Sequence, residues 1–160
     1  TSMVNLKFNH PVKEFVWVVQ NSLILELSTD NIGNDWFNFG DIPLKIKDDS
    51  IIQSDPMISG KFIIDGNDRM ETRTSKYFRL VQPYQRHTNI PTDTFIYVYS
   101  YSLYPESHQP SGTFNFSCID DLTFQITLNK DITRPVLQIF ATNYNILRIM
   151  GGMAGISYSN

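Results

Sequence analysis

The sequence contains few of the residues on which active-site chemistry depends. It has one cysteine, Cys118, and three histidines, His10, His87 and His108, in 160 residues. A single cysteine excludes an internal disulfide framework and is compatible with a reducing compartment. No His-x-His pair with a following glutamate occurs, so the metal cluster of enzymatic jelly rolls is missing and we expect no metal or cofactor. We expect the histidines to fix loops by hydrogen bonding and Cys118 to be buried as a small apolar residue.

The glycine-rich and nucleophile motifs of nucleotide-binding proteins and hydrolases are also missing. No G-x-G-x-x-G, G-x-x-x-x-G-K, G-x-S-x-G or H-E-x-x-H occurs in the chain. The glycine-rich run at 151–155 is followed by no basic residue, and it predicts a tight turn rather than a phosphate site. Neighbouring carboxylates such as Asp120 and Asp121 point to opposite faces of a strand, so they do not form an acid–base couple by themselves. The sequence therefore predicts no enzyme and no catalytic residue.

Charge of one sign and long apolar runs are scarce as well. Thirteen basic and sixteen acidic residues give a net charge of −3, which provides no general attraction to nucleic acid, so we expect no direct nucleic-acid binding. No apolar run approaches the ~20 residues that span a bilayer, and no signal peptide opens the chain. What is present is an apolar content of 41% and an aromatic content of 13%. A chain of this size and composition fits one globular domain that buries roughly 70% of its unfolded surface.

Alternation of apolar and polar residues with period two predicts strands along most of the chain. The alternating residues of 95–103, four aromatic residues and Leu103, share one face, and apolar residues alternate with Thr and Gln from Leu122 to Leu128. The run 12–20 is apolar on both faces, which is typical of a strand in the middle of a structure. The other predicted strands cover residues 4–8, 23–27, 58–65, 136–150 with a bend near 143–145, and 154–158.

One short helix is predicted before Pro83. Asp68 followed by Glu71 resembles a capping box, and residues 70, 74, 77 and 81 recur at helical spacing. About eight strands with long, irregular connections favour a jelly roll or Greek-key sandwich over an up-and-down barrel. We therefore expect an all-β, eight-stranded jelly-roll sandwich with one short helix in a connecting loop, as a single domain over residues 1–160.

Two loops are candidates for contacts with other subunits. Both contain aromatic residues and prolines, and aromatic residues are enriched in interfaces. A loop as long as the first, inside a compact domain, is usually functional. The candidate contact residues are Trp36, Phe37 and Phe39 in the first loop (28–56), and Tyr84 and His87 in the second (83–91).

Four segments of the chain carry a resemblance to a known family. They are residues 8–20, 77–91, 97–120 and 143–160, the last of which reads NYNILRIMGGMAGISYSN. In this order they resemble the major capsid protein of nucleocytoplasmic large DNA viruses, and the last two most resemble its phycodnavirus and mimivirus branch. Cys118 stands where an arginine is expected and Tyr104 where a lysine is common, which affects salt bridges at those positions and not the fold.

The resemblance implies a structural protein of an icosahedral virus shell. Members of that family fold as two consecutive jelly rolls, and three copies form a pseudo-hexagonal capsomer. This chain resembles only the second, C-terminal jelly roll, so we expect it to be part of a longer polypeptide. The expected partners are copies of itself, as a trimer of the full-length protein, and other capsid proteins, in a virion assembled in the host cytoplasm. The alternative is a glycan-binding jelly-roll module with Trp36 as its aromatic platform.

Overall fold

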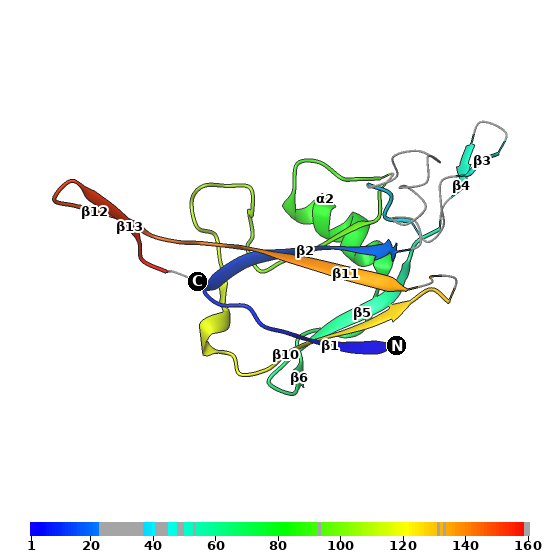
Figure 1. Cartoon of the computed structure of the whole chain (residues 1–160), viewed down its shortest axis with the longest axis horizontal. Helices are drawn as coiled ribbons and strands as arrows, with labels where there is room; N and C mark the ends of the chain where they lie inside the picture. The colour runs from blue at the N-terminus through cyan, green and yellow to red at the C-terminus, as the bar shows by residue number, and fades with distance from the viewer. Residues whose placement is uncertain are drawn as a thin grey trace.

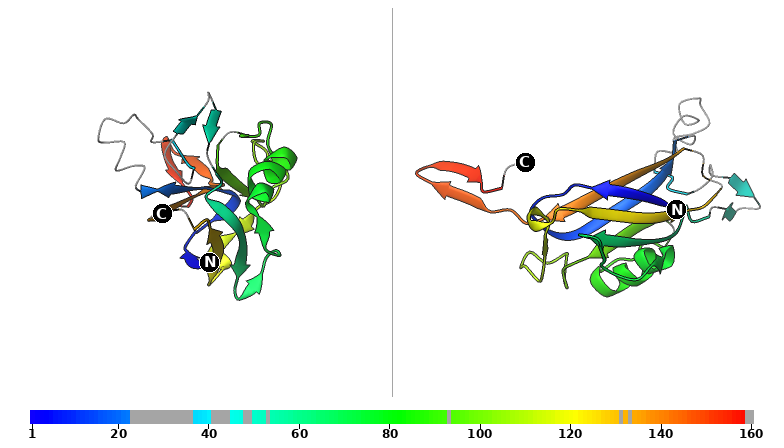
Figure 2. Two further views of the ribbon diagram at one scale, coloured as in Figure 1. Left: turned by 90° about the vertical axis from the view of Figure 1, so that its right-hand side faces the viewer. Right: turned by 90° about the horizontal axis from the view of Figure 1, so that it is seen from below.

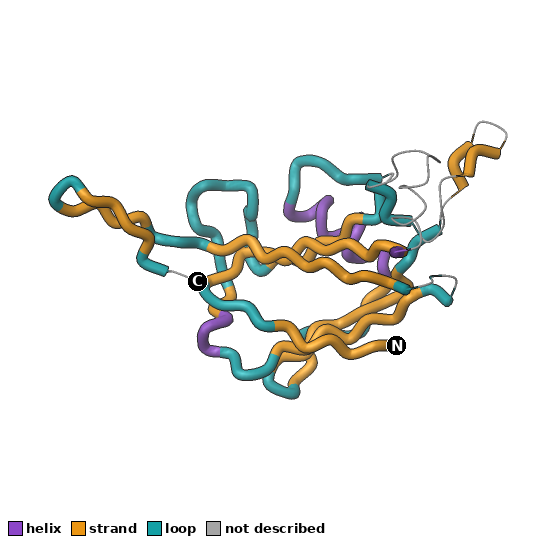
Figure 3. Tube along the Cα trace, viewed as in Figure 1, coloured by secondary structure: helices purple, strands orange, loops and turns teal. Residues whose placement is uncertain are grey.

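Two antiparallel sheets lying face to face form the body of the protein (Figure 1). The computed structural model describes residues 1–22, 37–40, 45–47, 50–52, 54–92, 94–130, 132 and 134–158. Figure 3 shows that strands run through most of the sandwich and that helical turns are confined to its margins. The predicted all-β architecture is therefore observed.

The strands divide between the sheets as follows. The first sheet has the order β1-β10-β5-β6, with β7 also paired to β5: β1 (Ser2–Leu6), β10 (Leu122–Leu128), β5 (Met57–Ile64), β6 (Asn67–Asp68) and β7 (Arg73–Thr74). The second sheet has the order β11-β2-β8, with β9 paired to β2: β11 (Pro135–Asn143), β2 (Pro11–Asn21), β8 (Ile96–Ser100) and β9 (Phe114–Asn115). Two separate hairpins pair β3 (Lys45–Lys47) with β4 (Ser50–Ile52) and β12 (Leu147–Met150) with β13 (Met153–Ile156).

Aromatic side chains from three strands fill the space between the sheets. The ring of Trp17 on β2 lies 5.7 Å from that of Phe62 on β5 and 5.3 Å from that of Phe124 on β10. Phe62 and Phe124 stack with their ring centroids 4.5 Å apart, and all three side chains are fully buried. Because β2 belongs to one sheet and β5 and β10 to the other, these contacts join the two layers.

A short helical segment closes the side of the sandwich next to β8 (Figure 2). It consists of a π-helical turn η1 (Tyr77–Val81) that continues into α2 (Gln82–Arg86). Phe78 enters the core, 5.1 Å from the ring of Trp17. The side-chain oxygen of Gln82 accepts a hydrogen bond from the Ser100 N–H at 3.2 Å. The helix therefore also provides a hydrogen-bond partner for a backbone N–H of β8.

The helix lies where the sequence places it, but its predicted bounds are wrong. Asp68 does not cap it, because Asp68 is in β6 and forms an ion pair with Lys61 across the hairpin at 2.7 Å. Pro83 does not end it, because Pro83 lies in the first turn of α2, where an N–H has no helical partner to lose. The segment expected to be loop from Tyr84 onward is therefore helical as far as Arg86.

The strand predictions agree with the structure in number and, for the most part, in position. Eight of the described strands have four or more residues, and the predicted bend near 143–145 separates β11 from β12. The predicted strand over 23–27 lies outside the described residues. Cys118, expected to be buried, is exposed, since in the 3₁₀ turn η2 (Phe116–Cys118) it is Phe116 that enters the core.

The aromatic contacts between the sheets predict a large loss of stability on truncation. We expect Trp17→Ala to lower the free energy of unfolding by about 3–5 kcal/mol, because the cavity opens where the two layers meet. Urea unfolding followed by circular dichroism measures it. Met3→Ala on β1, at a side chain that is 69% exposed, is the control and should change stability by no more than about 0.5 kcal/mol. A loss below about 1 kcal/mol for the Trp17 variant would contradict this role.

Candidate subunit-contact surface

The first predicted contact loop presents one aromatic side chain to solvent. Phe37 is 85% exposed, Phe39 is half-buried, and Trp36 lies outside the described residues. Asn38 between them is buried, and its side-chain oxygen accepts a hydrogen bond from the Gly40 N–H at 2.9 Å. This turn is fixed by Asn38 while the Phe37 ring projects outward.

The second predicted contact loop presents Tyr84 from α2. Its side chain is 76% exposed, whereas the preceding Gln82 and Pro83 are buried against the sandwich. Gln82 also donates to the hydroxyl oxygen of Tyr77 at 2.8 Å, so one face of the helix is fixed and the other is free to contact a neighbour.

A half-buried polar contact orients the helical segment further. The Arg79 guanidinium lies 3.8 Å from the Asp55 carboxylate and donates to the Thr92 carbonyl oxygen at 3.0 Å. The hydroxyl of Tyr97 on β8 donates to the same carboxylate. Burial raises the pKa of the Tyr97 phenol, and the Asp55 charge raises it further, so this hydroxyl stays a hydrogen-bond donor.

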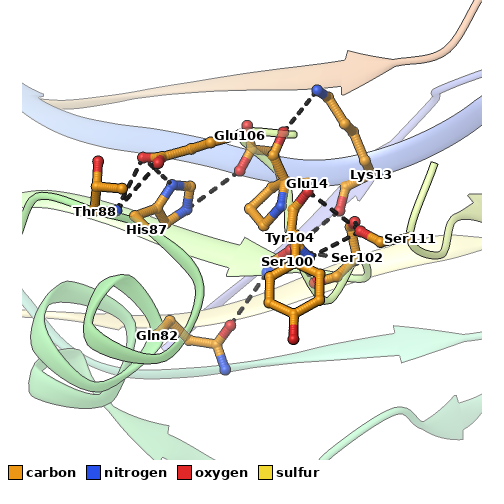
Figure 4. Close-up of polar contacts among 11 residues, drawn as sticks. Lys13, Glu14, Gln82, His87, Thr88, Ser100, Ser102, Tyr104, Glu106 and Ser111 are labelled. Atoms are coloured by element: carbon orange, nitrogen blue, oxygen red, sulfur yellow. Dashed lines mark hydrogen bonds and ion pairs between the residues drawn. The ribbon is translucent and has the colours of Figure 1, made fainter. Parts of the chain in front are cut away.

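His87 lies inward, between two carboxylates (Figure 4). Its Nε2 is 3.3 Å from Glu14 of β2 and its Nδ1 is 3.4 Å from Glu106. The His87 side chain is only 15% exposed, and the Thr88 N–H donates to Glu106 at 3.1 Å. Within the chain, His87 therefore joins the end of α2 to the loop that carries Glu106; its contact with another subunit stays a prediction.

The loop over residues 101–113 is braced from several sides, as Figure 4 also shows. Lys13 donates to the Pro105 carbonyl oxygen at 2.8 Å, and the hydroxyl of Ser111 accepts from the Tyr104 N–H at 2.8 Å. Leu103 and Tyr104 on this loop are nevertheless 54% and 67% exposed. Sequence reasoning missed them as contact candidates, although the prolines at 105 and 110 were a signal of a rigid turn.

The C-terminal hairpin is the most apolar exposed surface in the described part of the chain. We name residues 145–158, which contain β12 and β13, the C-terminal arm. Figures 1 and 2 show it projecting from one end of the sandwich. Its exposed large apolar side chains are Ile146, Leu147, Ile149, Met150, Met153 and Ile156, each between 57% and 77% exposed. Sequence reasoning treated these residues as ordinary sheet strands, because strand patterns do not reveal which faces lack a neighbour.

Metal-ligand clusters and membrane-spanning helices are both missing from the described part of the chain. Among the described residues, no group of three or more His, Cys, Asp or Glu side chains could hold a metal ion. In the same part of the chain, no helix is both long and apolar enough to cross a bilayer.

The family model for the major capsid protein of large eukaryotic DNA viruses matches residues 1–155. This chain belongs to that family. The major capsid protein of Pyramimonas orientalis virus is 36% identical over 182 residues, which cover 100% of this chain and 39% of the relative. The major capsid protein of Phaeocystis pouchetii virus is 50% identical over 109 residues, or 66% of this chain and 21% of the relative.

Solved capsid structures share the fold of this capsid-family chain. PBCV-1 VP54, in a crystal structure fitted into a reconstruction of the virophage Sputnik, matches with a TM-score of 0.77 and 29% identity over 99% of this chain and 46% of that chain. A quasi-atomic model of the PBCV-1 virus capsid matches with a TM-score of 0.74 and 30% identity, again over 99% and 46%. The predicted jelly roll is confirmed, and the chain spans less than half the length of these proteins.

Membership in this capsid family also answers two questions that the sequence raised. The family consists of structural components of virions, so the prediction that the chain is not an enzyme is confirmed. Nothing in these matches supports the glycan-binding alternative, whose expected platform, Trp36, lies outside the described residues.

The carboxylate of Glu106 predicts a pH-dependent brace. Its pKa is held below the ordinary value of 4.5, first of all because the carboxylate accepts the N–H of Thr88. Since its pKa is lower in the folded chain than in the unfolded chain, Glu106 stabilises the loop fully above about pH 4.5. The contribution is lost as the pH falls through the folded-state pKa.

Hydrogen exchange of the backbone amides in 101–113 measures this brace. We expect Glu106→Gln to lower their protection at neutral pH by roughly a factor of two to five, as for an exposed ion pair. The difference from wild type should vanish once the pH lies below the lowered folded-state pKa, where the carboxylate is protonated. Glu71→Gln, far from this loop in sequence and 87% exposed at its side chain, is the control. Equal protection in wild type and the Glu106 variant at neutral pH would contradict the brace.

Proposed function

We propose that this chain is a jelly-roll domain of a major capsid protein, and that copies of it pack side by side in an icosahedral virus shell. The family match over residues 1–155 is the observation that carries the proposal. A sandwich whose described residues contain no metal-binding cluster is consistent with a structural role.

The domain corresponds to the C-terminal jelly roll of a longer, double jelly-roll polypeptide. The VP54 match covers 99% of this chain and 46% of that protein, which supports a domain of a longer polypeptide. The choice of the C-terminal half rests on the resemblance described for the sequence. Three copies of the full polypeptide then form a pseudo-hexagonal capsomer that contacts other capsid proteins, and the virion assembles in the host cytoplasm. Closed symmetry of this kind converts many modest contacts into one stable assembly.

Purified particles test the proposed function directly. Mass spectrometry of virions should find peptides of this chain among the most abundant proteins, in one polypeptide with a preceding jelly-roll domain. Particles that lack these peptides, or that contain them only in trace amounts, would refute a shell role.

The predicted loops supply a test of the contact surface. Phe37→Ser and Tyr84→Ser, made in the longer polypeptide that contains this chain, should each weaken capsomer assembly about tenfold or more, because each removes an exposed aromatic side chain available for burial. Analytical ultracentrifugation measures assembly, and thermal melting checks that the fold is intact. Met3→Ser, at another exposed side chain, is the matched control. Assembly equal to wild type in both aromatic variants would remove these loops from the interface.

A further inference from the structure

The imidazole of His87 lies between two carboxylates that belong to different elements of the fold (Figure 4). Its Nε2 is 3.3 Å from Glu14 on β2, and its Nδ1 is 3.4 Å from Glu106 on the loop over residues 101–113. The backbone N–H of His87 donates to the Pro83 carbonyl oxygen at 2.8 Å, which places the side chain at the C-terminal end of α2. His87 therefore connects the helix, the sheet and the loop at one point.

The charge of the ring decides whether both contacts are favourable. A neutral imidazole has one N–H and one lone pair, whereas a protonated imidazole has two N–H groups. With a carboxylate beside each nitrogen, a neutral ring turns its lone pair toward a negative oxygen, and only the charged ring attracts both carboxylates. Histidine side chains gain or lose this proton between about pH 5 and 8, a range in which carboxylates ordinarily stay charged.

Burial makes the loss of this proton unfavourable for Glu14. The side chains of Glu14 and His87 are only 13% and 15% exposed, and the Oε2 atom of Glu14 accepts no hydrogen bond within the described part of the chain. Across the same residues, His87 is the only basic side chain that forms an ion pair with Glu14. When His87 is neutral, Glu14 is a largely buried charge without a counterion, which weakens the contact between β2 and the end of α2.

Two further cations lie next to this site in the sequence, and both make contacts elsewhere. Lys13 donates to the carbonyl oxygen of Pro105 at 2.8 Å. Arg86 lies near the phenol of Tyr99, whose pKa is raised by burial and partly lowered again by the positive charge of Arg86. Among the described ion pairs, neither cation contacts the two carboxylates. The balance of charge at the site therefore depends on the proton of His87.

The elements that meet at His87 carry exposed side chains of the candidate contact surface. Tyr84 on α2 is 76% exposed, and Leu103 and Tyr104 on the loop are 54% and 67% exposed. His87 and Glu106 are close to these side chains in sequence, so the contact between the two restricts how the helix and the loop move relative to each other. A surface that is fixed in advance loses less conformational entropy when a neighbour binds.

We propose that His87, with Glu14 and Glu106, is a proton-operated latch for this surface, which holds the loop over residues 101–113 and the end of α2 against β2 while the ring is protonated. Both carboxylates attract the positive form of the ring, so the stabilisation is present on the acid side of the transition and is lost as the pH rises. The opening is partial, because the Thr88 N–H still donates to Glu106 at 3.1 Å. This inference rests on the proposed shell function and adds regulation by pH to its contact surface.

Hydrogen exchange followed by mass spectrometry tests the latch in the longer polypeptide that contains this chain. Between about pH 5.5 and 8, the backbone amides of 83–91 and 101–113 should lose about tenfold in protection, after correction for the intrinsic pH dependence of exchange. The loss is expected because a largely buried carboxylate loses its counterion. Exchange of the imidazole C2 hydrogen in the same peptides reports the protonated fraction of His87, and the two pH profiles should coincide.

Two matched variants assign the pH dependence to His87. His87→Gln should show low protection that no longer varies over this range, since a glutamine side chain is neutral throughout. His108→Gln, at an exposed histidine of the same loop, is the control and should follow wild type. Constant protection in wild type, an imidazole that does not titrate in this range, or an unchanged profile in the His87 variant would each overturn the latch. The wild-type profile alone decides the matter if the variant does not fold.

The regulatory role has a separate test in assembly. Analytical ultracentrifugation of the longer polypeptide should show capsomer assembly about tenfold weaker at pH 8 than at pH 6 in wild type, and equal at the two pH values in His87→Gln. Assembly of wild type that does not vary with pH, while the protection does, would overturn the regulation of the contact surface. None of these results would affect the shell function, which depends on the presence of the chain in virions.

Discussion

The contact of Trp17 with Phe62 and Phe124 is the interaction on which the rest of the structure depends. It is the place where β2 of one sheet meets β5 and β10 of the other, and Phe78 of the helical segment packs on the same indole ring. Large aromatic rings bury much surface at a low cost in conformational entropy, so one cluster can fix the spacing of both layers. Loops and arm then extend from a body whose geometry is already determined.

The strands of the sandwich could be predicted from the sequence because the side chains that face the core recur at every second position of a strand. Tyr97, Tyr99 and Tyr101 face the core as the alternation in 95–103 predicts, and Leu122, Phe124 and Ile126 do so on β10. The helix bounds were less accessible to pattern reasoning. The sequence around Asp68 is typical of a helix cap. In the structure Asp68 instead pairs with Lys61, because β6 is hydrogen-bonded to β5.

The candidate contact surface was harder to predict from the sequence than the fold. Phe37 and Tyr84 are as exposed as a contact role requires, but the His87 side chain is largely buried and lies between two carboxylates that are distant in sequence. The arm escaped prediction for a similar reason. Apolar residues such as Ile149 and Met153 give the same sequence pattern in a buried strand and in an exposed one. Only the three-dimensional structure shows that this hairpin is exposed.

The corner at His10 links the core to the arm. Here the chain crosses from β1 in one sheet to β2 in the other, with His10 at φ 72°, in the left-handed region that non-glycine residues adopt at a cost of about 1–2 kcal/mol. The corner is held by hydrogen bonds from the His10 N–H to the Ser117 hydroxyl and from the Phe116 N–H to the His10 carbonyl oxygen, and by the stack of its ring on Tyr158. The arm therefore has two links to the sandwich: the backbone that continues from β11, and the ring contact of Tyr158 with His10 at the crossover between the two layers. A displacement of the arm would therefore affect both layers, since β11 belongs to one sheet and the His10 corner joins that sheet to the other.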